Sequence, residues 1–215
     1  MISSKFNCKE IFKEAYNNRY TWPNKFNGYS GKCIFVENQK SIKGEFILDS
    51  NFKPKITNIS DNNIVKGISS QLFEVAIHRV KRAFNEVHKN NNFQFLEESE
   101  EGLKIEVLGK NEGDKYIVKD KKINMVFRKI HGVIIEIFVK EFLDTGYGFL
   151  SKKYTSQQLD IETLNPKSKK LEYVDNFINL GINNMWALES RYIKFIDDNG
   201  KEQNINYFFK ELSLF

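Results

Sequence analysis

Three ionisable side chains are spaced so that they would share one face of a helix. Glu74, His78 and Arg82 stand at i, i+4 and i+8, a spacing that aligns side chains along one stripe of an α-helix. Glu74 can orient the imidazole of His78, and Arg82 adds a cation, which suits acid–base catalysis or anion binding. The same residues also suit a ladder of surface ion pairs. The spacing therefore leaves an enzymatic and a structural interpretation open.

Arginine is scarce in this chain. Among 33 basic residues only five are arginine, namely Arg19, Arg79, Arg82, Arg128 and Arg191. Arg128 and Arg191 alternate with apolar residues, which places each guanidinium on an apolar face of a predicted strand. A buried arginine requires a carboxylate or an anionic ligand as its partner. Glu136 and Glu189 are the candidate internal partners, and an anionic ligand is the alternative.

The sequence contains fragments of catalytic motifs but no complete motif. Asp144-Thr145-Gly146 matches half of an aspartic protease site, which needs two such loops to bring two carboxylates together. No second copy occurs, so a tight turn explains this segment better. His131 precedes Gly132 in a predicted hairpin turn, and no HExxH or Cys/His cluster exists. Glycine-rich nucleotide motifs are also missing, so we expect no metal and no cofactor.

Length, composition and charge exclude several classes of protein. The chain has 215 residues and 14% aromatic residues, which excludes a disordered or low-complexity protein. Its formal net charge is +5. The lysines are spread along the chain with no run of four basic residues, which indicates a solvated surface and no nucleic-acid partner.

The sequence gives no sign of membrane insertion or secretion. No stretch of 18 apolar residues occurs, and charges interrupt the first ten residues, so we expect neither a membrane span nor a signal peptide. Cys8 and Cys33 are the only cysteines and do not form a CxxC pair. They indicate reduced thiols and a cytoplasmic location.

Two segments have helical periodicity. Residues 7–20 place apolar side chains on one face, Asn7 and Glu10 form a capping signal, and Pro23 requires the helix to end before it. Residues 61–90 carry a wide apolar arc opposite a narrow polar strip. This second segment is predicted to be one long helix that is covered on most of its circumference.

The remaining segments alternate with period two and are separated by turn residues, of which Asp198-Asn199-Gly200 is the strongest hairpin signal. The predicted strands are 29–37, 42–49, 52–59, 93–98, 103–109, 114–119, 121–130, 133–142, 149–159, 171–180, 186–196 and 203–210. We expect a single α+β domain over residues 1–215. In it a curved antiparallel half-barrel, like that of lipoprotein carriers, wraps round the long helix, and a short N-terminal helix is added. A flat, covered sheet is the alternative.

Three segments carry a resemblance to a known family. They are residues 15–22 with 26–29, residues 74–82, and residues 130–132 with 144–151. Together they are similar to a family of uncharacterised proteins of about this length from cyanobacteria and plant chloroplasts. The resemblance implies a cytosolic or stromal protein of a photosynthetic cell, and it brings no catalytic residue with it.

These observations predict a non-enzymatic binding or assembly factor of a photosynthetic cell. An aromatic trough with a few cations suits an apolar anion such as a tetrapyrrole, pigment or lipid, or else a segment of a photosynthetic protein. The residues expected to meet the anionic groups are Arg79, Arg82, Arg128 and His131, and those expected at the rim are Tyr20, Trp22 and Tyr147. Arg128 and His131 face opposite sides of a regular strand, so both can serve only if the turn rotates His131 inward.

Two other functions stay open. One is an enzyme on the same scaffold that uses Glu74 and His78 as an acid–base pair. The other is a protein–protein adaptor whose trough is filled by its own helix and which needs no pocket.

Overall fold

The computed structural model describes residues 6–23, 25–181 and 184–215. The chain divides into two compact units, each built from two separate stretches of sequence. Unit 1 comprises Met1–Tyr20 and Arg82–Glu172, and unit 2 comprises Thr21–Lys81 and Tyr173–Phe215. The single domain expected over residues 1–215 stays a prediction.

Unit 1 holds two helices and six antiparallel strands. Its elements are α1 (Cys8–Asn17), α3 (Phe84–Val87), β4 (Asn91–Ser99), β5 (Gly102–Gly109), β6 (Lys115–Lys119), β7 (Lys122–Ile130), β8 (Val133–Asp144) and β9 (Phe149–Asp160). The strands lie in the order β9-β8-β7-β6-β5-β4, so each is hydrogen-bonded to its neighbour in sequence. Sequential hairpins of this kind follow from the closely spaced turn signals.

The helices of unit 1 pack on its sheet through aromatic side chains. Asn7 caps α1 by accepting a hydrogen bond from the backbone N–H of Glu10, as the sequence predicts. Phe12 of α1 is 1% exposed and lies with its ring 4.5 Å from Tyr116 and 6.1 Å from Phe84. The core of unit 1 consists of Cys8, Phe12, Ala15, Tyr16, Phe84, Leu103, Ile105, Val107, Tyr116 and Val118.

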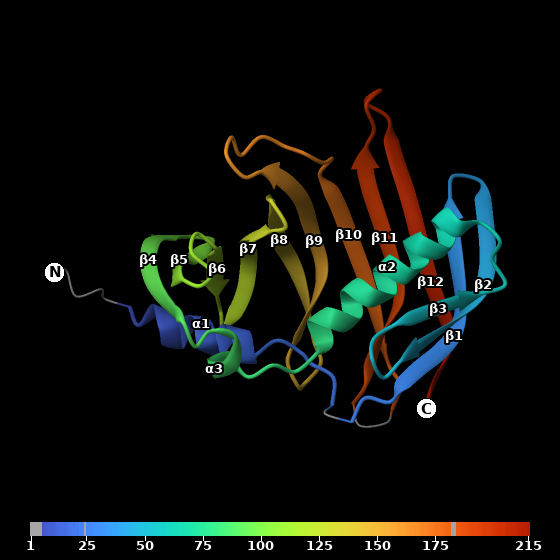
Figure 1. The fold of residues 1–215 in the computed structure, drawn as a ribbon, viewed down its shortest axis with the longest axis horizontal. Helices are drawn as coiled ribbons and strands as arrows, with labels where there is room; N and C mark the ends of the chain where they lie inside the picture. The colour runs from blue at the N-terminus through green and yellow to red at the C-terminus, as the bar shows by residue number, and fades with distance from the viewer. Residues whose placement is uncertain (1–5, 24, 182–183) are drawn as a thin grey trace. The chain divides into compact units, whose positions relative to one another are not determined.

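Unit 2 holds one helix and six antiparallel strands. Its elements are β1 (Gly28–Glu37), β2 (Lys40–Asp49), β3 (Pro54–Thr57), α2 (Asn62–Arg79), β10 (Leu171–Asn179), β11 (Trp186–Ile196) and β12 (Glu202–Leu214). The order β3-β2-β1-β12-β11-β10 places the first strand of the chain beside the last. Figure 1 shows α2 lying across the strands of this unit.

One stripe of α2 is buried against the sheet of unit 2. Asp61 caps the helix by accepting hydrogen bonds from the N–H groups of Asn63 and Ile64. Gly67 lies where an added Cβ would be 3.3 Å from the hydroxyl of Tyr207, so its small size permits the close approach. The buried residues of the helix are Ile64, Ile68, Leu72, Val75 and Ala76.

The predicted long helix over residues 61–90 is wrong, and so is the half-barrel wrapped round it. The helix ends at Arg79, Val80 and Ala83 are extended, and Phe84 begins the separate four-residue helix α3. The cause is tertiary, because the carbonyl of Arg79 accepts a hydrogen bond from the N–H of Trp22 while Phe84 joins the core of unit 1. Open antiparallel sheets with short helices therefore replace the expected trough.

The predicted strands are confirmed with small shifts at their ends. β3 and β4, each at one end of the strand order of its own unit, are also protected against pairing with other chains. β3 is four residues long and begins with Pro54, and the pairing of β4 is interrupted by a bulge between Phe95 and Glu97. Both features make strand addition unfavourable.

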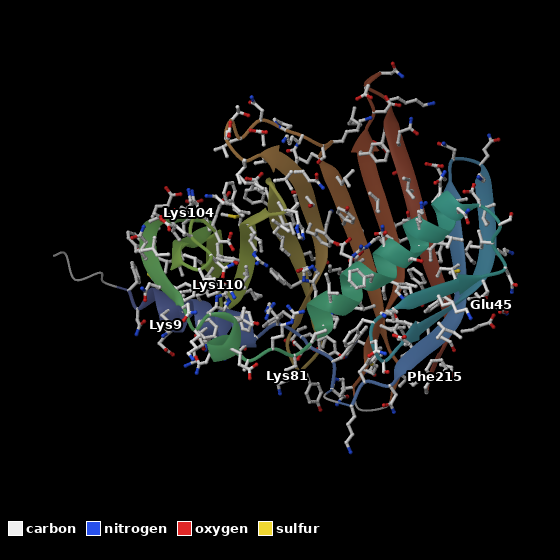
Figure 2. The ribbon with its side chains drawn as sticks, viewed as in Figure 1. Lys9, Glu45, Lys81, Lys104, Lys110 and Phe215 are labelled. Carbon is white, nitrogen blue, oxygen red and sulfur yellow. The ribbon has the colours of Figure 1, made fainter. Side chains whose placement is uncertain are left out.

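Lysines occupy the surface, as the spread of charge predicts. Lys9, Lys81 and Lys110 are exposed, and their side chains project away from the ribbon in Figure 2. None of the helices in the described part of the chain combines the length and the hydropathy that a transmembrane span requires.

Candidate functional site

The residues expected to form one ligand site belong to different units. Arg79 and Trp22 lie in unit 2, whereas Tyr20, Arg82, Arg128, His131 and Tyr147 lie in unit 1. The alternative acid–base pair, Glu74 and His78, lies in unit 2. Each group is therefore described within its own unit.

Arg191 is the centre of a buried polar cluster in unit 2. It is 2% exposed, and its Nε and Nη2 donate to the two carboxylate oxygens of Asp175 at 2.8 and 2.7 Å. Its Nη1 donates to Gln71 at 2.8 Å and contacts Glu74 at 3.4 Å, both on α2. The sequence predicts the burial of this arginine correctly, but Glu189 is the wrong partner. The cluster ties α2 to β10 and β11.

The two members of the proposed acid–base pair differ in their surroundings. The carboxylate of Glu74 contacts Arg191 and its side chain is 44% exposed. His78 lies exposed in the last turn of α2. Glu74 is thus engaged by a buried arginine, and the acid–base pair stays a prediction.

Trp22 lies inside unit 2. It is 3% exposed, its ring stacks on Phe26 at 4.2 Å, and its Nε1 donates to the carbonyl of Trp186. Arg79 lies over the ring of Phe177, 5.5 Å from its centroid. Trp22 therefore acts as a core residue of this unit.

In unit 1, the guanidinium of Arg128 also binds an internal carboxylate. Its Nε donates to Asp114 at 3.1 Å, and Asp114, which is 2% exposed, also accepts from the N–H of Lys129. Glu136 is therefore the wrong partner. Tyr20 is 2% exposed and its N–H donates to the carbonyl of Phe149, which makes it part of the interior.

A histidine that the sequence did not single out is buried in unit 1. His88 is 7% exposed, and its Nδ1 lies 2.9 Å from the side-chain nitrogen of Asn91. Asn91 Oδ1 accepts from the N–H of Asn111, which turns the Asn91 NH₂ group toward the imidazole. Nδ1 is thus the acceptor, and the ring is neutral with its proton on Nε2. Burial, with smaller contributions from Arg128 and Arg19, lowers the pKa of His88 to about 4.

The His88 ring lies in an aromatic cage. Four rings come within 6 Å of it, those of Phe12, Tyr16, Phe84 and Phe93. The spacing of His88 and Asn91 in the sequence could have indicated this contact, because a side-chain amide three residues after a histidine can form a hydrogen bond with its ring.

Arg82, His131 and Tyr147 are the exposed members of the expected set in unit 1. Arg82 follows the end of α2, and His131 stands in the β7–β8 turn with a φ of 49°. Tyr147 stands in the β8–β9 turn and is 67% exposed, the largest value among the exposed large apolar side chains of the described residues.

The β8–β9 turn holds its backbone through hydrogen bonds of its own. The N–H and Oγ1 of Thr145 both donate to the carbonyl of Gly148, at 3.1 and 2.7 Å. Oγ1 of Thr145 also accepts from the N–H of Tyr147, and the N–H of Gly146 donates to Asp144. The segment therefore functions as a turn, as the sequence predicts.

Gly148 fixes this turn to the segment after α1. Its φ is +133°, and an added Cβ would lie 2.7 Å from the nitrogen of Tyr20 and 2.8 Å from the carbonyl oxygen of Asn18. The N–H of Phe149 donates to the same Asn18 carbonyl. Only glycine fits this contact, so the backbone on both sides of Tyr147 is held in place.

Residues 3–215 match a family described as a protein of unknown function, DUF3386. The chain belongs to this family. Membership agrees with the resemblance to an uncharacterised family, while the expected origin in cyanobacteria and chloroplasts stays a prediction. No curated protein matches this DUF3386 chain.

One solved structure similar to the DUF3386 chain is a chain of the Pseudomonas aeruginosa MucA/MucB complex. The two chains are 9% identical, the match covers 97% of this chain and 95% of the other, and the TM-score is 0.29. This likeness is too weak to support a shared fold or function.

Within residues 6–23, 25–181 and 184–215, no three His, Cys, Asp or Glu side chains come together as a metal site.

Proposed function

We propose that this DUF3386 protein is a non-enzymatic binding protein that attaches to a partner protein through Tyr147. The observation that carries the proposal is the exposure of this ring on a fixed turn. A tyrosine that is 67% exposed adds little to its own core. The hydrogen bonds of Thr145 and the tight contact of Gly148 nevertheless hold the backbone of Tyr147 in place.

An aromatic side chain on an ordered backbone favours protein binding for two physical reasons. Tyrosine has few rotatable bonds, so little conformational entropy is lost when it becomes buried at an interface. A backbone that is already ordered avoids a further ordering cost on binding. Tyrosine is accordingly enriched among the residues that dominate binding energy.

The internal ion pairs of Arg128 and Arg191 favour a protein partner over an anionic pigment or lipid. Arg128 and Arg191 were expected on apolar faces where they could meet carboxylate tails. Both instead bind internal carboxylates, those of Asp114 and Asp175. At Arg191 an anionic ligand would have to displace a buried ion pair, which is unfavourable, and at Arg128, whose side chain is 40% exposed, it would compete with the carboxylate of Asp114.

Photo-cross-linking in the protein's native cells tests the proposal. A benzoylphenylalanine at position 147 keeps an aromatic ring on the turn and captures whatever covers it. The matched control carries the same residue at position 73, because Phe73 is 47% exposed on α2. We expect one discrete protein adduct from position 147 that position 73 does not give.

The purified partner then provides a quantitative test. Tyr147→Ala should weaken binding at least tenfold and leave the melting temperature unchanged, whereas Phe73→Ala should change neither. Equal adduct patterns at the two positions, or full affinity of Tyr147→Ala, would show that the turn does not bind a partner.

A further inference from the structure

The turn between β11 and β12 carries an asparagine–glycine bond that the proposed function does not use. The turn joins two strands of unit 2, drawn in red tones in Figure 1, and contains Asp198-Asn199-Gly200. Asn199 and Gly200 are both exposed. Apart from the two neighbours of Gly200 in the chain, no described residue has an atom within 4 Å of a Cβ added there, so the bond is uncovered.

An asparagine that is followed by glycine can modify itself. The backbone nitrogen of the glycine loses its proton to water or hydroxide and attacks Cγ of the asparagine, a path that no Cβ obstructs. The Cγ–Nδ2 bond breaks, the nitrogen takes up a proton and leaves as ammonia, and a five-membered succinimide forms. Water then opens the ring to give aspartate, or isoaspartate, in which the backbone runs through Cβ and Cγ. Asparagine is accordingly among the thermolabile residues.

The chain contains a second asparagine–glycine bond, Asn27-Gly28, in closed surroundings. Gly28 is buried at the start of β1, where it pairs with Asp49 of β2. An added Cβ would lie 2.5 Å from the carbonyl oxygen of Leu48 and 3.0 Å from the ring of Phe215. The attack on Cγ requires the peptide group between the two residues to rotate, and these contacts oppose that rotation. Asn27 is therefore an internal control in the same unit.

The β11–β12 turn opposes the reaction more weakly. The N–H of Gly200 donates to the carbonyl of Asp197 at 3.0 Å, and the N–H of Asn199 donates to Oδ1 of Asp197 at 2.9 Å. Both bonds lie in an exposed turn, where water replaces a broken hydrogen bond at small net cost. Within the described residues, the side-chain amide of Asn199 has no hydrogen-bond partner, so it is free to turn toward Gly200.

We propose that Asn199 is a self-modification site, which forms a succinimide with Gly200 in the folded protein and becomes aspartate or isoaspartate. Either product adds a negative charge beside Asp197 and Asp198, and isoaspartate also lengthens the backbone of the turn by one carbon atom. The isoaspartate form is the kind of substrate that isoaspartyl carboxyl methyltransferases recognise. The proposal is independent of protein binding through Tyr147, which lies in unit 1.

Ageing of the purified full chain at pH 7.5 and 37 °C tests the proposal. Peptide mapping by mass spectrometry measures the loss of each asparagine, and an isoaspartyl methyltransferase with a labelled methyl donor measures isoaspartate. We expect Asn199 to react at least tenfold faster than Asn27. In urea, where the fold no longer restrains either bond, the two rates should become similar.

A conservative variant places the label. Asn199→Gln keeps an amide on the turn but requires a larger, less favourable ring, so the isoaspartate label should fall at least tenfold. A label that persists in Asn199→Gln would arise elsewhere in the chain and would overturn the proposal.

The remaining outcomes are also decisive. An Asn199 that reacts in urea but stays intact in the folded chain would show that the hydrogen bonds of the turn protect it, and would overturn the proposal. Equal rates at Asn27 and Asn199 in the folded chain, or the same excess at Asn199 in urea, would show that the fold does not select the site. None of these results changes the expectation for Tyr147, so the proposed function is tested separately.

Discussion

Acid should destabilise unit 1 through His88. In the folded chain the imidazole is neutral, because Nδ1 accepts a hydrogen bond from Asn91 inside an aromatic cage. Protonation would place an N–H against the NH₂ group of Asn91. It would also add a positive charge near Arg128 and Arg19, which together with burial keep the pKa of His88 low. The unfolded chain has none of these restraints.

The sign and size of the effect follow from the two pKa values. The pKa of His88 is about 4 in the folded state, against 6.5 for an unperturbed histidine. Below pH 6.5 the unfolded state binds the proton first, so stability falls as the pH drops from 6.5 toward 4 and then levels off. With about 1.4 kcal/mol for each pKa unit, the loss at pH 4.5 is about 2.5 kcal/mol.

Urea denaturation at pH 7.5 and pH 4.5, followed by far-ultraviolet circular dichroism, measures this loss. His88→Phe keeps an aromatic ring in the cage and cannot titrate, so its stability should fall by about 2.5 kcal/mol less than that of the wild type between the two pH values. His131→Gln, in an exposed turn, should follow the wild type. Parallel pH dependences for wild type and His88→Phe would refute the assignment of a buried neutral imidazole.

The next two predictions each test a contact inside one unit. Arg191→Leu should cost about 3–5 kcal/mol, because it leaves Asp175 buried without its partner, and adding Asp175→Leu should recover much of the loss. Tryptophan fluorescence in urea measures the change in the free energy of unfolding, since Trp22 and Trp186 both lie in unit 2. A double variant that is as unstable as Arg191→Leu would contradict the role of the ion pair. Gly148→Ala should lower stability by about 1–3 kcal/mol in urea denaturation, because the added Cβ meets the backbone of Tyr20. An unchanged midpoint would show that the turn is not fixed by this contact.

The strands could be predicted from sequence because their signals are local. Turn residues mark each hairpin, as in Asp197, whose carboxylate accepts from the N–H groups of Asn199 and Lys201. The break after Arg79 has no such local mark. It depends on a hydrogen bond from Trp22, 57 positions earlier in the sequence, and on the packing of Phe84 in a different core. A continuous apolar arc cannot show that its two halves serve two cores.

The candidate site shows the same division between local and distant causes. Periodicity correctly indicated that Arg191 faces an apolar layer, but it suggested Glu189 on the same strand as partner. The actual partner, Asp175, lies across on β10, where it alternates with Tyr173 and Phe177. A carboxylate between two aromatic residues at period two was the available signal, since a buried acid also requires a partner.

The internal pairing of the arginines changes where a function is to be sought. Chains rich in lysine invite a search for cationic sites, yet Arg191 is buried in an ion pair with Asp175, and the half-buried Arg128 is paired with Asp114. The exposed large apolar side chains lie on strands, on α2 and in turns, and Tyr147 in the β8–β9 turn is the most exposed of them among the described residues. Burying such groups against another protein removes apolar surface from water without displacing an internal ion pair. Protein binding at the β8–β9 turn therefore requires little change in the folded chain.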